Sequence, residues 1–248
     1  MTPPETLALG RPVGAPPDSP GWTVRVVPNK YPAFAGQEVI VHGPAHVTRF
    51  AELSPEVLDA VAAAWELRVQ AATDTGAAWV LVCVNEGPGA GASLDHSHSQ
   101  LVPFDQVPPV LELETAAMAD SCPLCETLLH ERQNVVASDG DVEIICPSWS
   151  RIPFETWVVP TVHAPRAGRP AVITASIRQA VGRLQTVLGA ELAWNAIIHA
   201  SPPGGPDFHW HVEILPRLTV PASVELGAGV WVNTVDPAAA AEELRATA

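Results

Sequence analysis

Two similar segments indicate the fold of this 248-residue chain: "HSHSQLVP" (residues 96–103) and "HWHVEILP" (residues 209–216). Each begins with a histidine-x-histidine motif and continues into an apolar run. The segments before them correspond as well. The first half contains "VRVVPNKYP", "EVIVHGPAH" and "AAWVLVCVNEGPGAG", and the second contains "VEIICPSWSRIP", "ETWVVPTVH" and "LAWNAIIHASPPGGP". His46 precedes His96 by 50 residues, and His163 precedes His209 by 46. The agreement in order and spacing predicts two copies of one structural unit.

Each unit is predicted to be an antiparallel sheet with a helix packed on it. The β-branched runs, bounded by proline, glycine or asparagine, are typical of strands. Apolar periodicity predicts helices over 55–72 and 171–188, and Ser54 with the proline after it is a start signal for the first. The acidic stretch 111–120 is predicted to be a helical connector. We therefore expect an α+β fold of two tandem units over 1–110 and 111–248, each an antiparallel sheet with a helix packed on it, and a short helix after Asp236.

Composition narrows the classes of function. The chain is 47% hydrophobic with a net charge of −14, so it can bury a sizeable core but lacks the basic clusters that bind nucleic acid. It has no run of roughly 18 apolar residues, and its first twenty residues do not have the pattern of a signal peptide. The expectation is a cytoplasmic globular protein without a nucleic-acid or membrane partner.

The first histidine pair is suited to phosphoryl chemistry. On an extended strand His96 and His98 project from the same face. The preceding "NEGPGAGAS" (residues 85–93) lets the backbone approach a ligand closely, because glycine and alanine carry little bulk. A neutral imidazole can attack phosphorus directly. The alternative for an isolated motif of this kind is a pair of surface histidines without a ligand.

Four ordered segments carry a more specific resemblance: "VRVVPNKYPAF", "GAGASLDHSHSQLV", "PFETWVVPTVH" and "FHWHVEILPRLT". Together they resemble the signature segments of the galactose-1-phosphate uridylyltransferase family, within the histidine-triad superfamily, over about residues 22–245. The resemblance implies that His98 is the nucleophile and that Gln100 contacts the transferred phosphate. It also implies that Ser93 and Asn85 help to seat the phosphates and that Asn29 lies near the nucleoside. For both asparagines, turn formation at a strand end is the alternative.

A metal site is predicted in the second half. Cys122 and Cys125, with His163 and His209, supply two thiolates and two imidazoles, a donor set that suits tetrahedral zinc. The alternative is a turn carrying two reduced thiols. His211 occupies the place that His98 has in the first unit, but no glycine-alanine-serine run precedes it, so a structural or substrate-lining role is expected.

The chain departs from the family pattern in two places. Ser97 stands where the family has proline between the two histidines. The family also begins with an arginine-bearing segment and a CxxC pair that have no counterpart here, which leaves His46 and His96 as a possible residual first metal site without cysteines. We expect the native chain to begin upstream of Met1; the alternative is a natural loss that left the first site empty or recruited an acid such as Asp95.

The resemblance implies a nucleotidyltransferase. The main expectation is a UDP-glucose:hexose-1-phosphate uridylyltransferase, which moves UMP from UDP-glucose to galactose 1-phosphate through a uridylyl-histidine at His98. The alternatives are a phosphorylase or adenylyltransferase acting on an ADP-sugar or a dinucleoside polyphosphate, and a non-catalytic nucleotide-binding protein. The expected partners are a nucleotide sugar and a sugar 1-phosphate, the expected cofactor is zinc, and the family's habit implies a homodimer.

Overall fold

A computed structural model describes residues 3–247, which form one sheet of ten strands together with six α-helices. The strands are β1 (Leu7–Leu9), β2 (Val24–Pro28), β3 (Glu38–Val41), β4 (Trp79–Glu86), β5 (His98–Phe104), β6 (Val135–Ser138), β7 (Val142–Ile145), β8 (Thr156–Pro160), β9 (Trp194–His199) and β10 (His211–Pro216). The helices are α1 (Pro55–Asp74), α2 (Pro109–Met118), α3 (Pro123–His130), α4 (Ala171–Leu188), α5 (Ser223–Ala228) and α6 (Pro237–Arg245). Among these residues no helix is long and apolar enough to cross a membrane.

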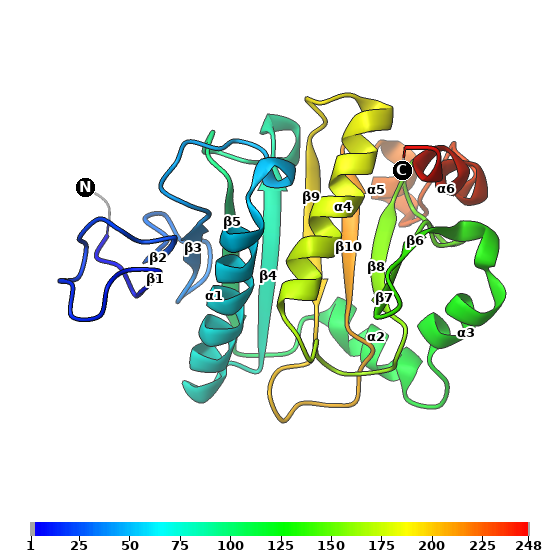
Figure 1. Ribbon diagram of the computed structural model, residues 1–248. Helices are drawn as coiled ribbons and strands as arrows, with labels where there is room; N and C mark the ends of the chain where they lie inside the picture. The colour runs from blue at the N-terminus through cyan, green and yellow to red at the C-terminus, as the bar shows by residue number, and fades with distance from the viewer. Residues whose placement is uncertain (1–2, 248) are drawn as a thin grey trace.

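The sheet order repeats the same topology twice. The strands run β1-β2-β3-β5-β4-β9-β10-β8-β7-β6, so β2-β3-β5-β4 is matched by β7-β8-β10-β9 in the second half (Figure 1). The tandem α+β fold is thereby confirmed. The two half-sheets are joined edge to edge, because β4 pairs antiparallel with β9 and sets Asn85 opposite Asn195. This pairing satisfies the backbone groups that two separate sheets would leave exposed at their edges.

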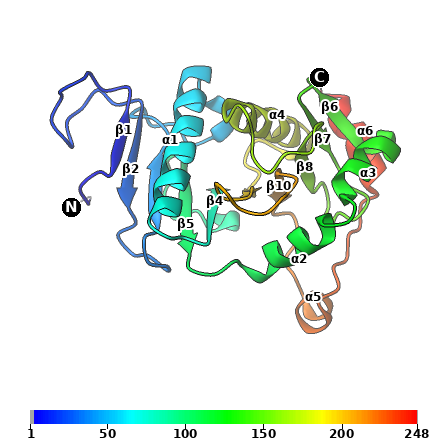
Figure 2. The same cartoon turned by 90° about the horizontal axis from the view of Figure 1, so that it is seen from below.

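Helices α1 and α4 cover one face of the sheet, as Figures 1 and 2 show. The apolar residues of both helices enter one core with the inward residues of the strands. The helices predicted over 55–72 and 171–188 are both present: α1 continues to Asp74, and α4 has the predicted bounds. The Ser54 side chain accepts a hydrogen bond from the Val57 N–H at 3.3 Å, as expected of a helix N-cap, which typically contributes about 1 kcal/mol.

The opposite face of the sheet carries α2, whose Leu111 packs in one cluster with Trp79 of β4 and Phe208. Figure 2 shows α2 on the side of the sheet away from α1 and α4. The predicted connector helix is α2, and the predicted C-terminal helix is α6, where the Asp236 carboxylate accepts from the N–H groups of Ala238 and Ala239.

Candidate functional site

His98 lies at the start of β5 with its imidazole held in one orientation. Nδ1 is 2.8 Å from the backbone carbonyl oxygen of His96. Because a carbonyl oxygen only accepts, Nδ1 is the protonated nitrogen, and in the neutral ring Nε2 keeps its lone pair. The residue is 5% exposed and borders a cavity of about 430 Å³. A buried imidazole with one nitrogen fixed and the other directed to a cavity is prepared for nucleophilic attack.

The glycine-rich loop between β4 and β5 forms a wall of this cavity. Its lining residues include Asn85, Gly87, Ser93 and His96 beside His98. Gly87 has a φ of 82°, and a Cβ there would meet the Ala193 Cβ at 3.0 Å. A larger residue would push the loop away from the second unit, so glycine is needed for this close approach.

Asn195 of β9 fixes the same loop and was not anticipated from the sequence. Its side-chain NH2 donates to Asn85 Oδ1 at 2.8 Å and to the Ala90 carbonyl at 2.9 Å. Asn85 therefore lies at the cavity, as expected, with its amide oxygen engaged by the second unit. The segment "WNAII" does place a polar side chain, Asn195, within an apolar strand. Its role could not be predicted, because the strand that it contacts, β4, is far away in the sequence.

Gln100 and Asn29 occupy different surroundings. Gln100 lies two residues after His98 on the same face of β5, and its Oε1 accepts from Gln37 Nε2 at 2.6 Å. Asn29 Oδ1 accepts from the Tyr31 N–H at 3.0 Å, which is the turn chemistry weighed as its alternative. Asn29 lines a separate cavity together with Gln37.

A buried hydrogen-bond network supports the strand behind His98. His42 Nδ1 lies 3.0 Å from Ser97 Oγ, and His42 Nε2 lies 2.9 Å from Ser99 Oγ, so one ring joins the residues on both sides of His98. Trp65 Nε1 of α1 also donates to Ser99 Oγ at 2.7 Å. This network constrains the strand on both sides of His98.

The network predicts a pH dependence of stability. Burial lowers the pKa of His42 well below 6.5, and repulsion from His98 and His96 adds to the effect. Below pH 6.5 the unfolded chain therefore takes up a proton that the folded protein does not, and the free energy of unfolding falls by about 1.4 kcal/mol per pH unit for this one group. In His42→Gln, urea titrations between pH 7 and pH 5 should show a correspondingly smaller loss. His130→Gln, at an exposed position on α3, is the control, and equal pH slopes in all three proteins would contradict the prediction.

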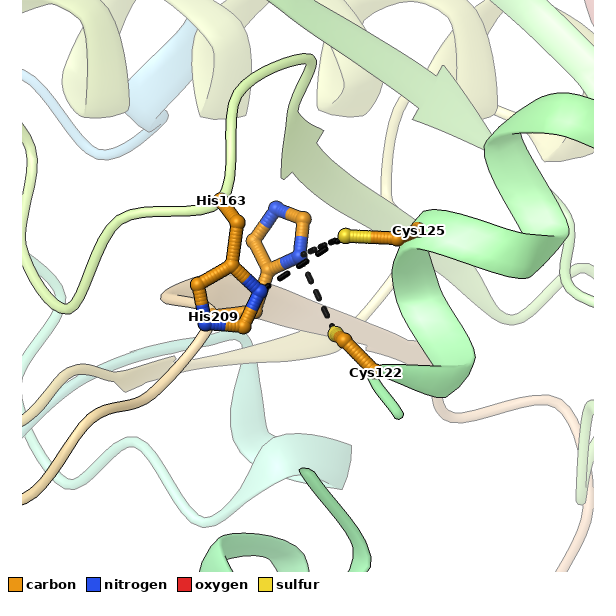
Figure 3. A group of neighbouring side chains, drawn as sticks. All are labelled: Cys122, Cys125, His163 and His209. Atoms are coloured by element: carbon orange, nitrogen blue, oxygen red, sulfur yellow. Dashed lines mark hydrogen bonds between the residues drawn. The ribbon is translucent and has the colours of Figure 1, made fainter. Parts of the chain in front are cut away.

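The four residues predicted to bind metal come together at the start of α3 (Figure 3). Cys122 Sγ lies 3.3 Å from His209 Nδ1, and Cys125 Sγ lies 3.5 Å from His209 Nδ1 and 3.6 Å from His163 Nδ1. All four ligand atoms lie within 4.8 Å of one another. Tetrahedral zinc, with Zn–S about 2.3 Å and Zn–N about 2.0–2.1 Å, sets neighbouring sulfur and nitrogen atoms roughly 3.5 Å apart. The donor set and the spacing therefore fit a divalent metal ion.

The outer contacts of this quartet also suit a metal. Each imidazole directs Nδ1 inward, while His209 Nε2 donates to the Pro160 carbonyl at 2.9 Å and His163 Nε2 lies 3.4 Å from Asp207 Oδ1. A carbonyl partner such as that of His209 orients a metal-binding histidine. Burial and the neighbouring Cys122 raise the pKa of the Cys125 thiol to about 11. Binding of a cation by the thiolates would therefore release protons.

The expected residual first site consists of two imidazoles. His46 and His96 have ring centroids 5.6 Å apart, and His96 Nε2 donates to the Gly43 carbonyl at 3.0 Å. Within residues 3–247 no cysteine or carboxylate joins them in a metal-binding group. Two imidazoles alone fall short of the four ligands typical of a structural zinc site.

The counterpart of His98 in the second unit is closed off. His211 also donates from Nδ1 to the backbone carbonyl two residues earlier, at 2.9 Å, but it is 0% exposed and Trp157 stacks on its ring at 4.6 Å. Glu114 of α2 lies over it, with Oε2 3.8 Å from His211 Nε2 and 2.8 Å from His199 Nδ1. The second copy of the site is thus filled by protein side chains, and these form a cluster of ligand-type groups in which Glu114 is half-buried and the other three are buried: Glu114, His199, His211 and Glu213.

Comparisons with known proteins agree with this geometry. Residues 31–108 match the family model described as "Galactose-1-phosphate uridyl transferase, N-terminal domain". ADP-glucose phosphorylase of Arabidopsis thaliana is 26% identical over 93% of this chain and 76% of its own length. Galactose-1-phosphate uridylyltransferase of Thermotoga maritima is 24% identical over 85% of this chain and 73% of its own.

Solved structures share the fold. The crystal structure of an ADP-glucose phosphorylase from Arabidopsis thaliana with bound ADP-glucose superposes with a TM-score of 0.85 at 24% identity, covering 98% of this chain and 86% of that one. A uridylyltransferase structure gives a TM-score of 0.83 at 24% identity, covering 94% of this chain and 88% of that one. The chain is thus similar to the galactose-1-phosphate uridylyltransferase family in sequence over residues 31–108, and it shares the fold of these solved structures over nearly its whole length.

Proposed function

We propose that the protein transfers a nucleoside monophosphate from a nucleoside diphosphate sugar to phosphate through a covalent His98 intermediate, with ADP-glucose as the donor. The observation that carries the proposal is His98 itself, whose Nδ1 is tied to the His96 carbonyl while Nε2 is free beside the cavity. The choice of an ADP-sugar rests on the likeness to the Arabidopsis phosphorylase, which extends over 93% of this chain. This is the alternative that the sequence left open beside a uridylyl donor.

The reaction consists of two displacements at one phosphorus atom. In the first, the Nε2 lone pair of His98 attacks the α-phosphorus of ADP-glucose, the bond from that phosphorus to the bridging oxygen breaks, and glucose 1-phosphate leaves. In the second, an oxygen of inorganic phosphate attacks the same phosphorus, the N–P bond breaks, and ADP leaves with the imidazole restored. Covalent catalysis divides the exchange into two similar steps.

The surrounding groups act by binding negative charge. Among the described residues no lysine or arginine lines the cavity beside His98, so neutral donors are the groups proposed to hold the phosphates. Gln100, Ser93 and the amides of the glycine-rich loop are the donors that this chain offers near His98. Donors fixed before the reaction stabilise charge that develops on the phosphoryl oxygens without having to reorganise.

We further propose that Cys122, Cys125, His163 and His209 hold one structural zinc ion. Zinc bound there would tie the α2–α3 connector to the segments before α4 and β10. The ion would stabilise the fold, and four protein ligands leave no open position of the kind found in catalytic zinc sites.

Parallel incubations test the proposed donor and acceptor. The protein is given ADP-glucose or UDP-glucose, each with inorganic phosphate or galactose 1-phosphate, and the products are resolved by anion-exchange chromatography. Formation of ADP and glucose 1-phosphate from ADP-glucose and phosphate is the expected result. Turnover only with UDP-glucose and galactose 1-phosphate would assign the uridylyltransferase reaction instead, and no turnover with any pair would favour a non-catalytic nucleotide-binding protein.

A homodimer is also proposed, because the segment around α5 exposes apolar side chains. This apolar arm extends beyond α2 in Figure 2 and contains the exposed residues Leu218, Val220, Val224, Leu226, Val230, Trp231 and Val232. Exposed apolar side chains gathered in one segment support an interface between two copies of the chain. Light scattering should give twice the 26.2 kDa chain mass, and Leu226→Asp with Trp231→Ser should reduce it to one chain. A monomeric wild-type protein would contradict the prediction.

A further inference from the structure

Gln37 lies just before β3 and is held by the turn that precedes it. It is 8% exposed. Its backbone carbonyl accepts from the Asn29 N–H at 2.8 Å, and its backbone N–H donates to the Phe34 carbonyl at 3.2 Å. Its side chain reaches Gln100 on β5, the neighbouring strand of the sheet. The Gln37 carboxamide is therefore fixed at both ends while most of it is out of water.

The hydrogen bonds of Gln37 distinguish the oxygen end of its carboxamide from the NH2 end. The backbone N–H of Ala33 points at one end at 2.8 Å, and because a backbone N–H only donates, that end is the oxygen Oε1. The other end is then the NH2 group, which donates to Gln100 across 2.6 Å. The reverse assignment would set two donors against each other at both contacts.

The Gln37 NH2 group in turn fixes the orientation of the Gln100 carboxamide. The end of Gln100 that meets the Gln37 NH2 has to accept, so it is the oxygen Oε1. The NH2 group of Gln100 is then the end that points away from Gln37. Among residues 3–247 it donates no hydrogen bond. Gln100 lies on the same face of β5 as His98, where a phosphoryl group bonded to Nε2 needs hydrogen-bond donors and would be repelled by a carbonyl oxygen.

We propose that Gln37 is a positioning residue, which turns the Gln100 carboxamide so that its NH2 group faces the transferred phosphoryl group. The relay runs from the Ala33 N–H through Gln37 to Gln100. This inference rests on the proposed function for its catalytic consequence, and the orientation of Gln100 stands on the hydrogen bonds alone.

Three substitutions at Gln37 separate the effect of its hydrogen-bonding groups from the effect of its side-chain volume. In Gln37→Glu, one carboxylate oxygen still accepts from Ala33 while the other now faces Gln100, which has to rotate and present its oxygen to the phosphoryl group. The rate of His98 adduct formation should fall by roughly 10-fold or more, mainly in kcat, since loss of one oriented donor costs up to about 10²–10³ in kcat. In Gln37→Met the Gln100 amide is free to rotate, and the loss should be smaller. Gln37→His keeps one accepting and one donating nitrogen, and should stay within about threefold of the wild type.

A double-mutant cycle shows whether Gln37 acts through Gln100. In a Gln100→Met background, Gln37→Glu should have no further effect on the rate, because the group that it reorients is gone. Equal losses in both backgrounds would overturn the proposal, as would an unchanged rate in Gln37→Glu. Thermal unfolding of each variant identifies any loss that comes from misfolding, and Gln37→His then supplies the folded comparison.

A second measurement needs no turnover. In isotope-labelled wild-type protein, NMR coupling across the hydrogen bond from Gln37 Nε2 to the Gln100 carboxamide carbon should be detectable. Its absence, with the Gln100 NH2 group instead bonded to Gln37, would overturn the proposal whatever the activity. A protein that shows this coupling but forms no adduct with either nucleotide sugar would retain the orientation of Gln100 and lose the proposed function.

Discussion

The His98→Ala protein is expected to lose nucleotidyl transfer by at least about 10³-fold, equivalent to about 4 kcal/mol of transition-state stabilisation. The loss should be this large because His98 is the proposed nucleophile, and its counterpart in the second unit, His211, is buried beneath Trp157 and cannot replace it. Steady-state release of glucose 1-phosphate from ADP-glucose is the measurement.

Two further variants make the His98 result specific. His130→Ala, on the exposed surface of α3, should keep wild-type activity. His98→Gly should regain part of its activity when imidazole is added, because the free ring can enter the space of the lost side chain. An active His98→Ala protein would remove His98 from the reaction.

The Cys122→Ser protein is expected to lose its zinc and much of its stability. Cys122 is 9% exposed, and it is the residue from which α3 begins, so loss of the metal releases the connector from His209. A loss of about 3 kcal/mol or more is expected, which for a domain of this size lowers Tm by about 6–12 °C. Elemental analysis of protein purified without chelator should give about one zinc per chain for the wild type and far less for the variant.

Cys83→Ser is the matched control for the metal prediction. Cys83 is a half-buried thiol on β4, outside the quartet, so its replacement should leave the zinc content unchanged. Wild-type protein without zinc, or equal zinc in Cys122→Ser and the wild type, would contradict the metal assignment.

Features with a local cause could be predicted from the sequence. Helix α4 has the predicted bounds of residues 171–188, because an apolar stripe and the flanking residues define it within one segment. The repeat was visible because each unit keeps its own strand and histidine order. The repeat also allowed the cluster of Cys122, Cys125, His163 and His209 to be predicted. Corresponding positions in the two units indicate which distant histidines meet the CxxC pair.

Features that depend on one tertiary contact could not be predicted. The pairing of β4 with β9, which makes one sheet of two, joins strands more than a hundred residues apart. His42 is an ordinary residue at a strand end until Ser97 and Ser99 are seen beside its ring. For Asn29 the local pattern was compatible with both a ligand contact and a turn, and the structure shows the turn hydrogen bond.

Intact-mass spectrometry of the protein after brief exposure to ADP-glucose, without phosphate, tests the covalent mechanism most directly. We expect the protein to gain one adenylyl group per chain, which peptide mapping should locate at His98. The adduct should be labile to acid, as a phosphoramidate is, and should be removed when phosphate is added. An adduct on another residue, or glucose 1-phosphate released with no adduct at any time in a rapid-quench series, would contradict it.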